Sequence, residues 1–328
     1  MTRLTKVELL RLWWRRLPQI AAVASLGFVV VFLLGLGQQV ANLEEQRAEA
    51  EQMYEENLRW WQESQSPEMV AECLEQQARE RELADDPTID FGCRQPPPRL
   101  EDFLWGPPDL AAAYGEVLVG IAAALLAVVL VMGASSTAAE FAHRTIGTWL
   151  TFEPRRSRVW ASKVAAAALA AVPVTLAFLA LAFVGPWLIY TVGDQPTTVT
   201  GDQWGDLAWT SLRLLLLAVL ICAVGAAAGL LLRHTGAVLG VLVAYFIAVE
   251  GMLRQLLPGM ETWLLSVNIN AVLRGGYSWT SYDCSSDAMN CREVVHTLSM
   301  GRGLVYLAVL ALVVLVASWW ATRERDVD

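Results

Sequence analysis

The sequence predicts an all-α integral membrane protein with six transmembrane helices, cytoplasmic N and C termini, and a large extracellular helical hairpin between the first two spans. Three observations predict this class. Hydrophobic residues make up 55% of the 328 residues and charged residues only 17%, whereas soluble domains contain about 25% charged residues. The apolar residues form long runs, and the basic residues cluster in alternate loops.

Six stretches are apolar enough to cross a bilayer core of about 30 Å, which needs about 20 helical residues. They are residues 19–38, 110–134, 164–192, 207–232, 237–257 and 303–321. Pro173 and Pro186 predict kinks in the third span, because proline removes a backbone donor. The fifth span is the weakest, since Glu250 and Arg254 interrupt it.

The distribution of lysine and arginine predicts the orientation. Thirteen basic residues lie in the short segments on one side, which are residues 1–18, 135–163, 233–236 and 322–328. Nine lie in the much longer segments on the other side, residues 39–109, 193–206 and 258–302. Because short basic loops stay in the cytoplasm, both termini are predicted to be cytoplasmic. An apolar stripe in residues 1–18 predicts an amphipathic helix at the membrane surface.

The cysteines agree with this orientation. Cys73 and Cys93 lie in the first outer segment, Cys284 and Cys291 lie in the third, and Cys222 lies alone in the fourth span. A pair in each of two outer segments is typical of chains whose exterior is oxidising. We therefore predict the disulfides Cys73–Cys93 and Cys284–Cys291, with four free thiols as the alternative.

The first outer segment is strongly acidic. Residues 39–110 contain 18 aspartates and glutamates against 6 arginines, a net charge of −12. Helical periodicity predicts two helices, with Ser66 as the N-cap and Pro67 as the first residue of the second. The hairpin could be a lid, a filter for cationic cargo or a docking site, or its charges could only keep it soluble. Residues 258–302 look partly interfacial and could re-enter the membrane.

Several chemistries have no motif in this sequence. Neither lysine, Lys6 or Lys163, follows a glycine, so the chain contains no Gly-Lys-Ser/Thr phosphate loop. Metalloprotease and nucleophile-elbow motifs are also missing, and the three histidines lie far apart. We therefore expect no enzyme site, no cofactor and no metal on this chain. No basic face is large enough to predict nucleic-acid binding.

The inner segment between the second and third spans is the most informative. Thr137 and Glu140 form a Thr-x-x-Glu pattern, which predicts a capping box at the start of a short helix. Gly147 is a plausible end of that helix. The segment continues into a basic stretch that ends at Lys163, at the foot of the third span.

This segment resembles the permease subunits of type-two ATP-binding-cassette (ABC) exporters. The order of residues matches the pattern of that family: Glu140, Gly147-Thr148, Leu150, Pro154, Ser157-Arg158 and Lys163. The resemblance is clearest over residues 130–185 and is topological elsewhere. The first outer segment is longer than is usual for the class.

The resemblance implies a coupling helix that docks onto a separate cytoplasmic ATPase subunit, which would hold ATP and Mg. Glu140, Arg144, Gly147 and Thr148 would make this contact; the alternative is an ordinary basic loop that sets topology. The N-terminal amphipathic helix would flank the contact or only anchor the chain. The resemblance also implies two ATPase subunits, a second permease copy or a paralogue, and a bacterial plasma membrane.

The expected function is therefore export of a hydrophobic or amphipathic substrate by a transport subunit without an ATPase site of its own. The alternative is a membrane scaffold or sensor whose acidic outer hairpin binds a partner. An ATPase subunit that co-purifies with the chain would favour the first.

Four ionisable residues fall within or at the ends of spans: Glu116, Arg213, Glu250 and Arg254. Such residues usually face protein or water, because a charge at a helix centre costs at least about 2.5–3.5 kcal/mol. All four are predicted at the same outer depth, with Glu250 and Arg254 as an i, i+4 pair. They could form an outer gate or cavity network, or snorkel to the headgroups. The small-residue motifs 225–229 and 236–240 predict close helix packing within the chain.

Overall fold

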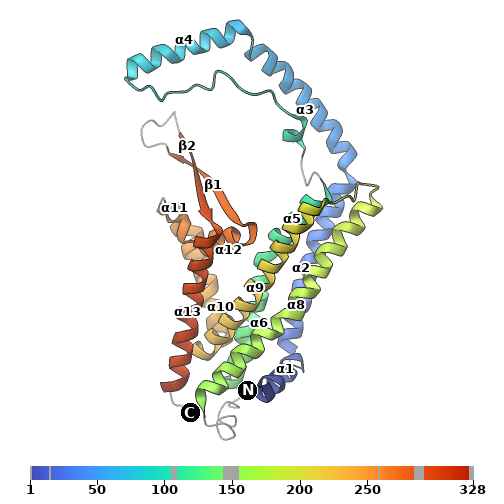
Figure 1. Ribbon diagram of the computed structural model, residues 1–328, viewed down its shortest axis with the longest axis vertical. Helices are drawn as coiled ribbons and strands as arrows, with labels where there is room; N and C mark the ends of the chain where they lie inside the picture. The colour runs from blue at the N-terminus through green and yellow to red at the C-terminus, as the bar shows by residue number, and fades with distance from the viewer. Residues whose placement is uncertain are drawn as a thin grey trace.

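The computed structural model describes residues 2–14, 16–104, 109–142, 155–257, 259–283 and 292–324. Most of these residues are helical, and six helices are long and apolar enough to cross a membrane. The chain is thus built as a multi-pass membrane protein. Figure 1 shows a long helical bundle with α1 and the end of α13 at one end and an arm at the other. We call these the terminal end and the arm end.

The bundle contains all six predicted spans. Its helices are α2 (Arg16–Ala41), α5 (Leu110–Gly120), α6 (Ala122–Ala142), α8 (Arg156–Val192), α9 (Gly201–Leu232), α10 (Thr235–Tyr245) and α13 (Met300–Glu324). The second span is divided between α5 and α6, and α8 continues through both of its prolines. The fifth span passes from α10 into a π-helix, η2 (Phe246–Leu253), and a last turn, α11 (Arg254–Leu256).

The centre of the bundle is the crossing of α6 and α9. Their backbones come so close that a β-carbon at Gly133 would collide with the carbonyl oxygen of Cys222, and one at Gly225 with that of Leu130. Small residues allow this approach, as is usual where helices associate in lipid. The motif 225–229 therefore packs as predicted. The motif 236–240 does not, since no atom lies within 4 Å of a β-carbon built at Gly240.

The arm consists of α3 (Leu43–Ser64), α4 (Pro67–Ala84) and a return segment that includes the short helix η1 (Leu100–Phe103). Ser66 caps α4 by accepting a hydrogen bond from the amide of Met69, and Pro67 is the first helical residue, as predicted. The return segment is held by side chains of both helices: the Trp61 indole donates to the carbonyl of Gln95 (3.0 Å), and Gln77 accepts from the amide of Phe91 (2.9 Å).

The Cys73–Cys93 disulfide is confirmed and joins α4 to the return segment, with a Cα–Cα distance of 5.7 Å. The bond closes a loop over a sequence separation of 20 residues, which corresponds to about 2–4 kcal/mol of stabilisation. We expect Cys73→Ser to loosen the return segment without unfolding the bundle. Limited proteolysis should then cleave near residues 85–99 faster than in the wild type, while the bundle's thermal unfolding temperature changes little.

Two expectations from the sequence are corrected. The chain is not all-α, because β1 (Gly276–Asp283) and β2 (Arg292–Ser299) form an antiparallel hairpin in which Gly276 pairs with Ser299. Residues 259–274 form η3 (Met260–Trp263) and α12 (Leu265–Arg274), which lie beside α13 in Figure 1. Thr137 and Glu140 do not begin a helix, since α6 runs through both. The predicted bond between Cys284 and Cys291 lies outside the described residues.

Candidate functional site

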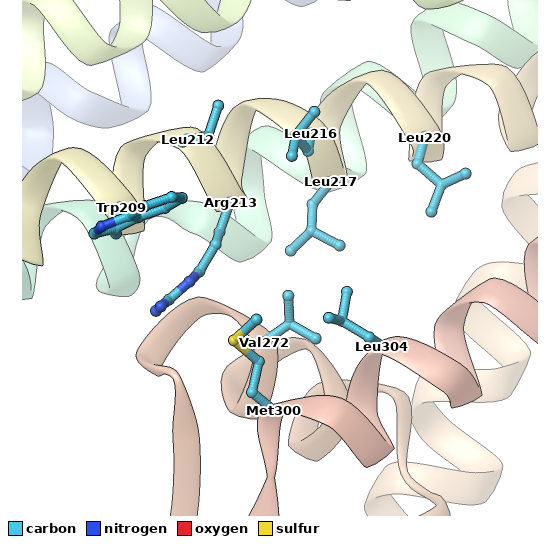
Figure 2. Close-up of a pocket in the computed structure, with 9 residues that line it drawn as sticks. All are labelled: Trp209, Leu212, Arg213, Leu216, Leu217, Leu220, Val272, Met300 and Leu304. Atoms are coloured by element: carbon cyan, nitrogen blue, oxygen red, sulfur yellow. The ribbon is translucent and has the colours of Figure 1, made fainter.

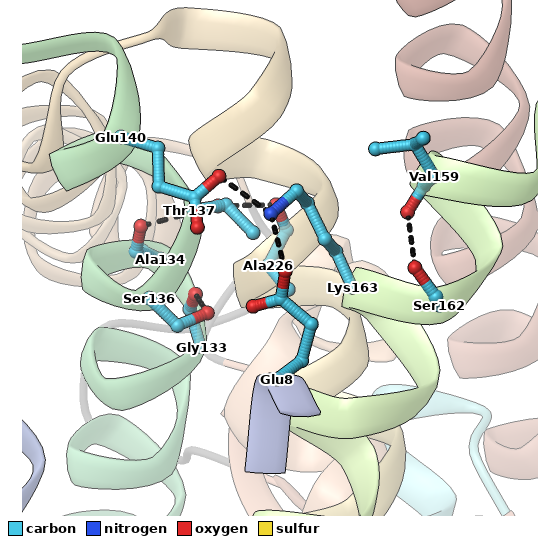
Figure 3. A network of polar contacts seen from close by, with 10 residues as sticks. All are labelled: Glu8, Gly133, Ala134, Ser136, Thr137, Glu140, Val159, Ser162, Lys163 and Ala226. Atoms are coloured by element: carbon cyan, nitrogen blue, oxygen red, sulfur yellow. Dashed lines mark hydrogen bonds and ion pairs between the residues drawn. The ribbon is translucent and has the colours of Figure 1, made fainter. Parts of the chain in front are cut away.

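A buried group of three charges lies at the terminal end of the bundle. The ammonium of Lys163 on α8 lies 2.9 Å from Oε1 of Glu8 on α1 and 2.5 Å from Oε2 of Glu140 on α6. The exposed fractions of these side chains are 2%, 8% and 1%. Figure 3 shows the lysine between the two carboxylates. We call Glu8, Glu140 and Lys163 the charge triad.

Helix positions explain how the triad assembles. Lys163 lies in the first turns of α8, just before its apolar run, and α1 (Thr2–Trp14) packs along this part of α8. Nearby hydroxyls bond to helix backbone: Thr137 donates to the carbonyl of Ala226 on α9 (2.8 Å), and Ser136 to that of Gly133 (2.6 Å). These bonds satisfy the hydroxyl groups that lie near the triad.

The triad is a strong mechanical connection. Buried charges keep their ionised form only when opposite charges compensate their lost hydration, and removing one partner typically costs about 3–5 kcal/mol. A displacement of α6 relative to α8 or α1 therefore has to break or carry along a buried ion pair. The triad joins α1, α6 and α8 to one another through a single ammonium.

The predicted contact residues are only partly placed. Glu140 is buried rather than presented at the surface, because α6 continues past Thr137 and keeps Glu140 facing α8. It therefore holds helices together, which corrects the expectation that it touches a partner directly. Arg144, Gly147 and Thr148 lie outside the described residues. Glu8 was not predicted as a residue of this site, because its position on the polar face of a helix does not indicate which other helix packs against it.

At the arm end, charges meet both ends of α12. The carboxylate of Glu250 accepts a hydrogen bond from the amide of Ser266 (2.9 Å), and the Tyr245 hydroxyl accepts one from the amide of Leu265 (3.0 Å). At the other end, the Arg213 guanidinium donates to the carbonyl of Leu273 (3.3 Å). An acid at the first turn and a base at the last complement the free backbone groups and the helix dipole.

This arrangement revises the predicted gate. Glu250 and Arg254 do not pair within the described residues, because the intervening π-helix changes the turn that would bring positions i and i+4 together. Arg254 is exposed, and Glu116 is exposed on α5 in the electrostatic range of Arg274. Glu250 and Arg213 therefore bond to the backbone of α12, whereas Glu116 interacts only electrostatically with the last residue of α12, Arg274.

Two pockets adjoin α12. One of about 420 Å³ lies between α9, α12 and α13 and includes Arg213 (Figure 2). The other, of about 130 Å³, lies between α6, α10 and α12 and includes Ser266 and Asn270. Within the described part of the chain, no group of three or more His, Cys, Asp or Glu side chains could hold a metal ion.

Comparison with known proteins gives one match. A family model described as "Protein of unknown function (DUF2705)" matches residues 103–327, which begin in the arm's return segment and run to the end of the bundle. No curated protein and no solved structure matches the chain.

Proposed function

The chain belongs to the DUF2705 family of proteins of unknown function, and we propose that it is the transmembrane permease subunit of an ATP-driven exporter. In this proposal the chain contributes moving helices, and separate cytoplasmic ATPase subunits bind ATP and Mg. It exports a hydrophobic or amphipathic substrate from a bacterial cell, together with a second permease copy or a paralogue.

The charge triad is the observation that carries the proposal. Glu140 near the end of α6 and Lys163 near the start of α8 both lie in residues 135–163, the segment in which the resemblance to ABC exporters places the coupling helix. An ATPase that pushes on this segment would act on both flanking helices, which the triad joins to each other and to α1. The triad thus supplies a physical link between nucleotide-driven closure and the bundle.

The orientation belongs to the same proposal. The terminal end faces the cytoplasm, where the ATPase subunits are, and the arm end faces the exterior. The Cys73–Cys93 disulfide in the arm supports this, because disulfides persist in oxidising compartments. In this arrangement Arg144, Gly147 and Thr148 contact the ATPase, and Glu140 positions the segment that carries them.

Purification of the tagged full chain from its native membrane tests the proposal. We expect an ATP-hydrolysing subunit to co-purify, and we expect Arg144→Glu to remove most of that subunit by reversing a charge at the contact. Arg302→Glu, a charge reversal at the arm end, is the matched control and should keep the wild-type amount. Purified chain with no ATPase, or equal amounts in both variants, would contradict the proposal.

A second candidate function is a scaffold or sensor that binds a partner through the arm. The observation in its favour is that the acidic arm extends away from the bundle and is braced by its own disulfide (Figure 1). The same purification separates the two functions, because a scaffold requires no ATPase and is indifferent to the charge of Arg144.

A further inference from the structure

The pocket between α9, α12 and α13 has one cation in an apolar lining. Six of its residues come from α9 between Trp209 and Leu220, one is Val272 of α12, and two are Met300 and Leu304 of α13. Arg213 is the only charged residue among them. Its volume of about 420 Å³ is within the range of about 300–1,000 Å³ typical of ligand sites.

The Arg213 guanidinium has more hydrogen-bond donors than its contacts in the structure use. Its guanidinium carries five N–H groups, and the structure gives it one hydrogen bond, to the carbonyl of Leu273 at 3.3 Å. No carboxylate within the described ranges forms an ion pair with it. Figure 2 shows the side chain reaching from α9 toward the turn after α12, next to Trp209 and at one end of the leucine-lined part of the pocket. The site therefore offers a positive end and an apolar body.

The pocket opens between two candidate spans. α9 and α13 are both apolar enough to cross a membrane, and the pocket residues Leu212, Leu216 and Leu304 are between 42% and 59% exposed. Exposed leucines on spanning helices face hydrocarbon, so a molecule that enters sideways comes from the bilayer. An indole beside the charged end matches the preference of tryptophan for the headgroup level.

From these contacts we propose that the pocket binds an anionic phospholipid of the surrounding bilayer. One acyl chain lies along Leu216, Leu217 and Leu304, and the phosphate accepts hydrogen bonds from the free N–H groups of Arg213. Guanidinium groups suit phosphate because they donate two parallel hydrogen bonds. The lipid then lies against the C-terminal end of α12 and bridges α9 and α13. Lipid binding at this site does not require an ATPase partner, so the lipid proposal can be tested independently of the proposed function.

Lipid retention tests the site. The full chain is reconstituted with equal amounts of phosphatidylglycerol and phosphatidylcholine, transferred to detergent and analysed by native mass spectrometry. We expect the wild type to retain phosphatidylglycerol in preference. Arg213→Gln should lower the retained ratio about tenfold, the equivalent of one charge-assisted hydrogen bond. Arg213→Lys should keep part of the preference.

Two further variants complete the test. Leu304→Trp fills the apolar part of the pocket but leaves Arg213 in place, and it should also lower the retention of phosphatidylglycerol. If Arg213→Gln does not fold, this variant provides the test instead. Arg302→Gln removes a cation of α13 outside the pocket and should match the wild type. Equal retention of both lipids, or an unchanged ratio in Arg213→Gln, would overturn the assignment.

Discussion

Replacing Lys163 with methionine is expected to lower the free energy of unfolding by about 3–5 kcal/mol, the cost of breaking a buried ion pair by removing one partner. The methionine fills a similar volume but takes away the ammonium that Glu8 and Glu140 share. The measurement is thermal or denaturant unfolding of the purified chain in detergent, with elution as a single species to show that the variant has folded.

The sequence provides a matched control for this experiment. Lys6 is the chain's other lysine, and it lies exposed on α1, two residues before Glu8 in the sequence. Lys6→Met should change stability by no more than about 0.5 kcal/mol, as is usual for surface substitutions. Adding Glu140→Gln to Lys163→Met should recover part of the loss, because it also removes a buried negative charge. Equal losses in Lys6→Met and Lys163→Met would contradict the role of the triad.

Gly225→Ala is expected to destabilise the bundle by at least about 1–3 kcal/mol, the usual cost of overpacking a core. The added methyl group meets the backbone of Leu130, which cannot rotate away as a side chain could. α6 and α9 would have to separate at one of their close contacts. The unfolding measurement described for Lys163 detects the loss, and Gly133→Ala should behave in the same way against Cys222.

Gly240→Ala is the control for these glycines. It changes the same residue type in a spanning helix, but the new methyl group meets no atom within 4 Å. Alanine also favours a helix over glycine by about 1 kcal/mol, so this variant should be as stable as the wild type or more so. Loss of stability in Gly240→Ala equal to that in Gly225→Ala would show that the close crossing is not the cause.

The spanning helices and the two helices of the arm, α3 and α4, could be predicted because their signals are local. Twenty apolar residues in a row have few alternatives to a membrane helix, and Ser66-Pro67 marks a helix start by its own chemistry. The hairpin of β1 and β2 was missed, although β1 contains Tyr277, Trp279 and Tyr282, which are typical strand residues. Its context between two spans favoured an interfacial loop instead.

The sequence indicated which polar and charged residues make specific contacts, but it did not indicate the groups that they contact. Thr137 and Glu140 fit a capping box, yet tertiary packing keeps α6 helical and gives Thr137 a bond to Ala226, 89 residues away. Glu250 was expected to pair with Arg254, but the π-helix between them turns the carboxylate toward Ser266. Both errors came from applying a local rule where a distant backbone group was the better partner.

The scarcity of lysine gives the triad a chemical signature. With Lys6 exposed and the ammonium of Lys163 enclosed by two carboxylates, amine-selective acylation of the folded chain is directed to the outer side of α1. Acylation of the inner lysine therefore marks those molecules in which α1, α6 and α8 have moved apart, so ordinary protein-labelling chemistry can follow the opening of this end of the bundle.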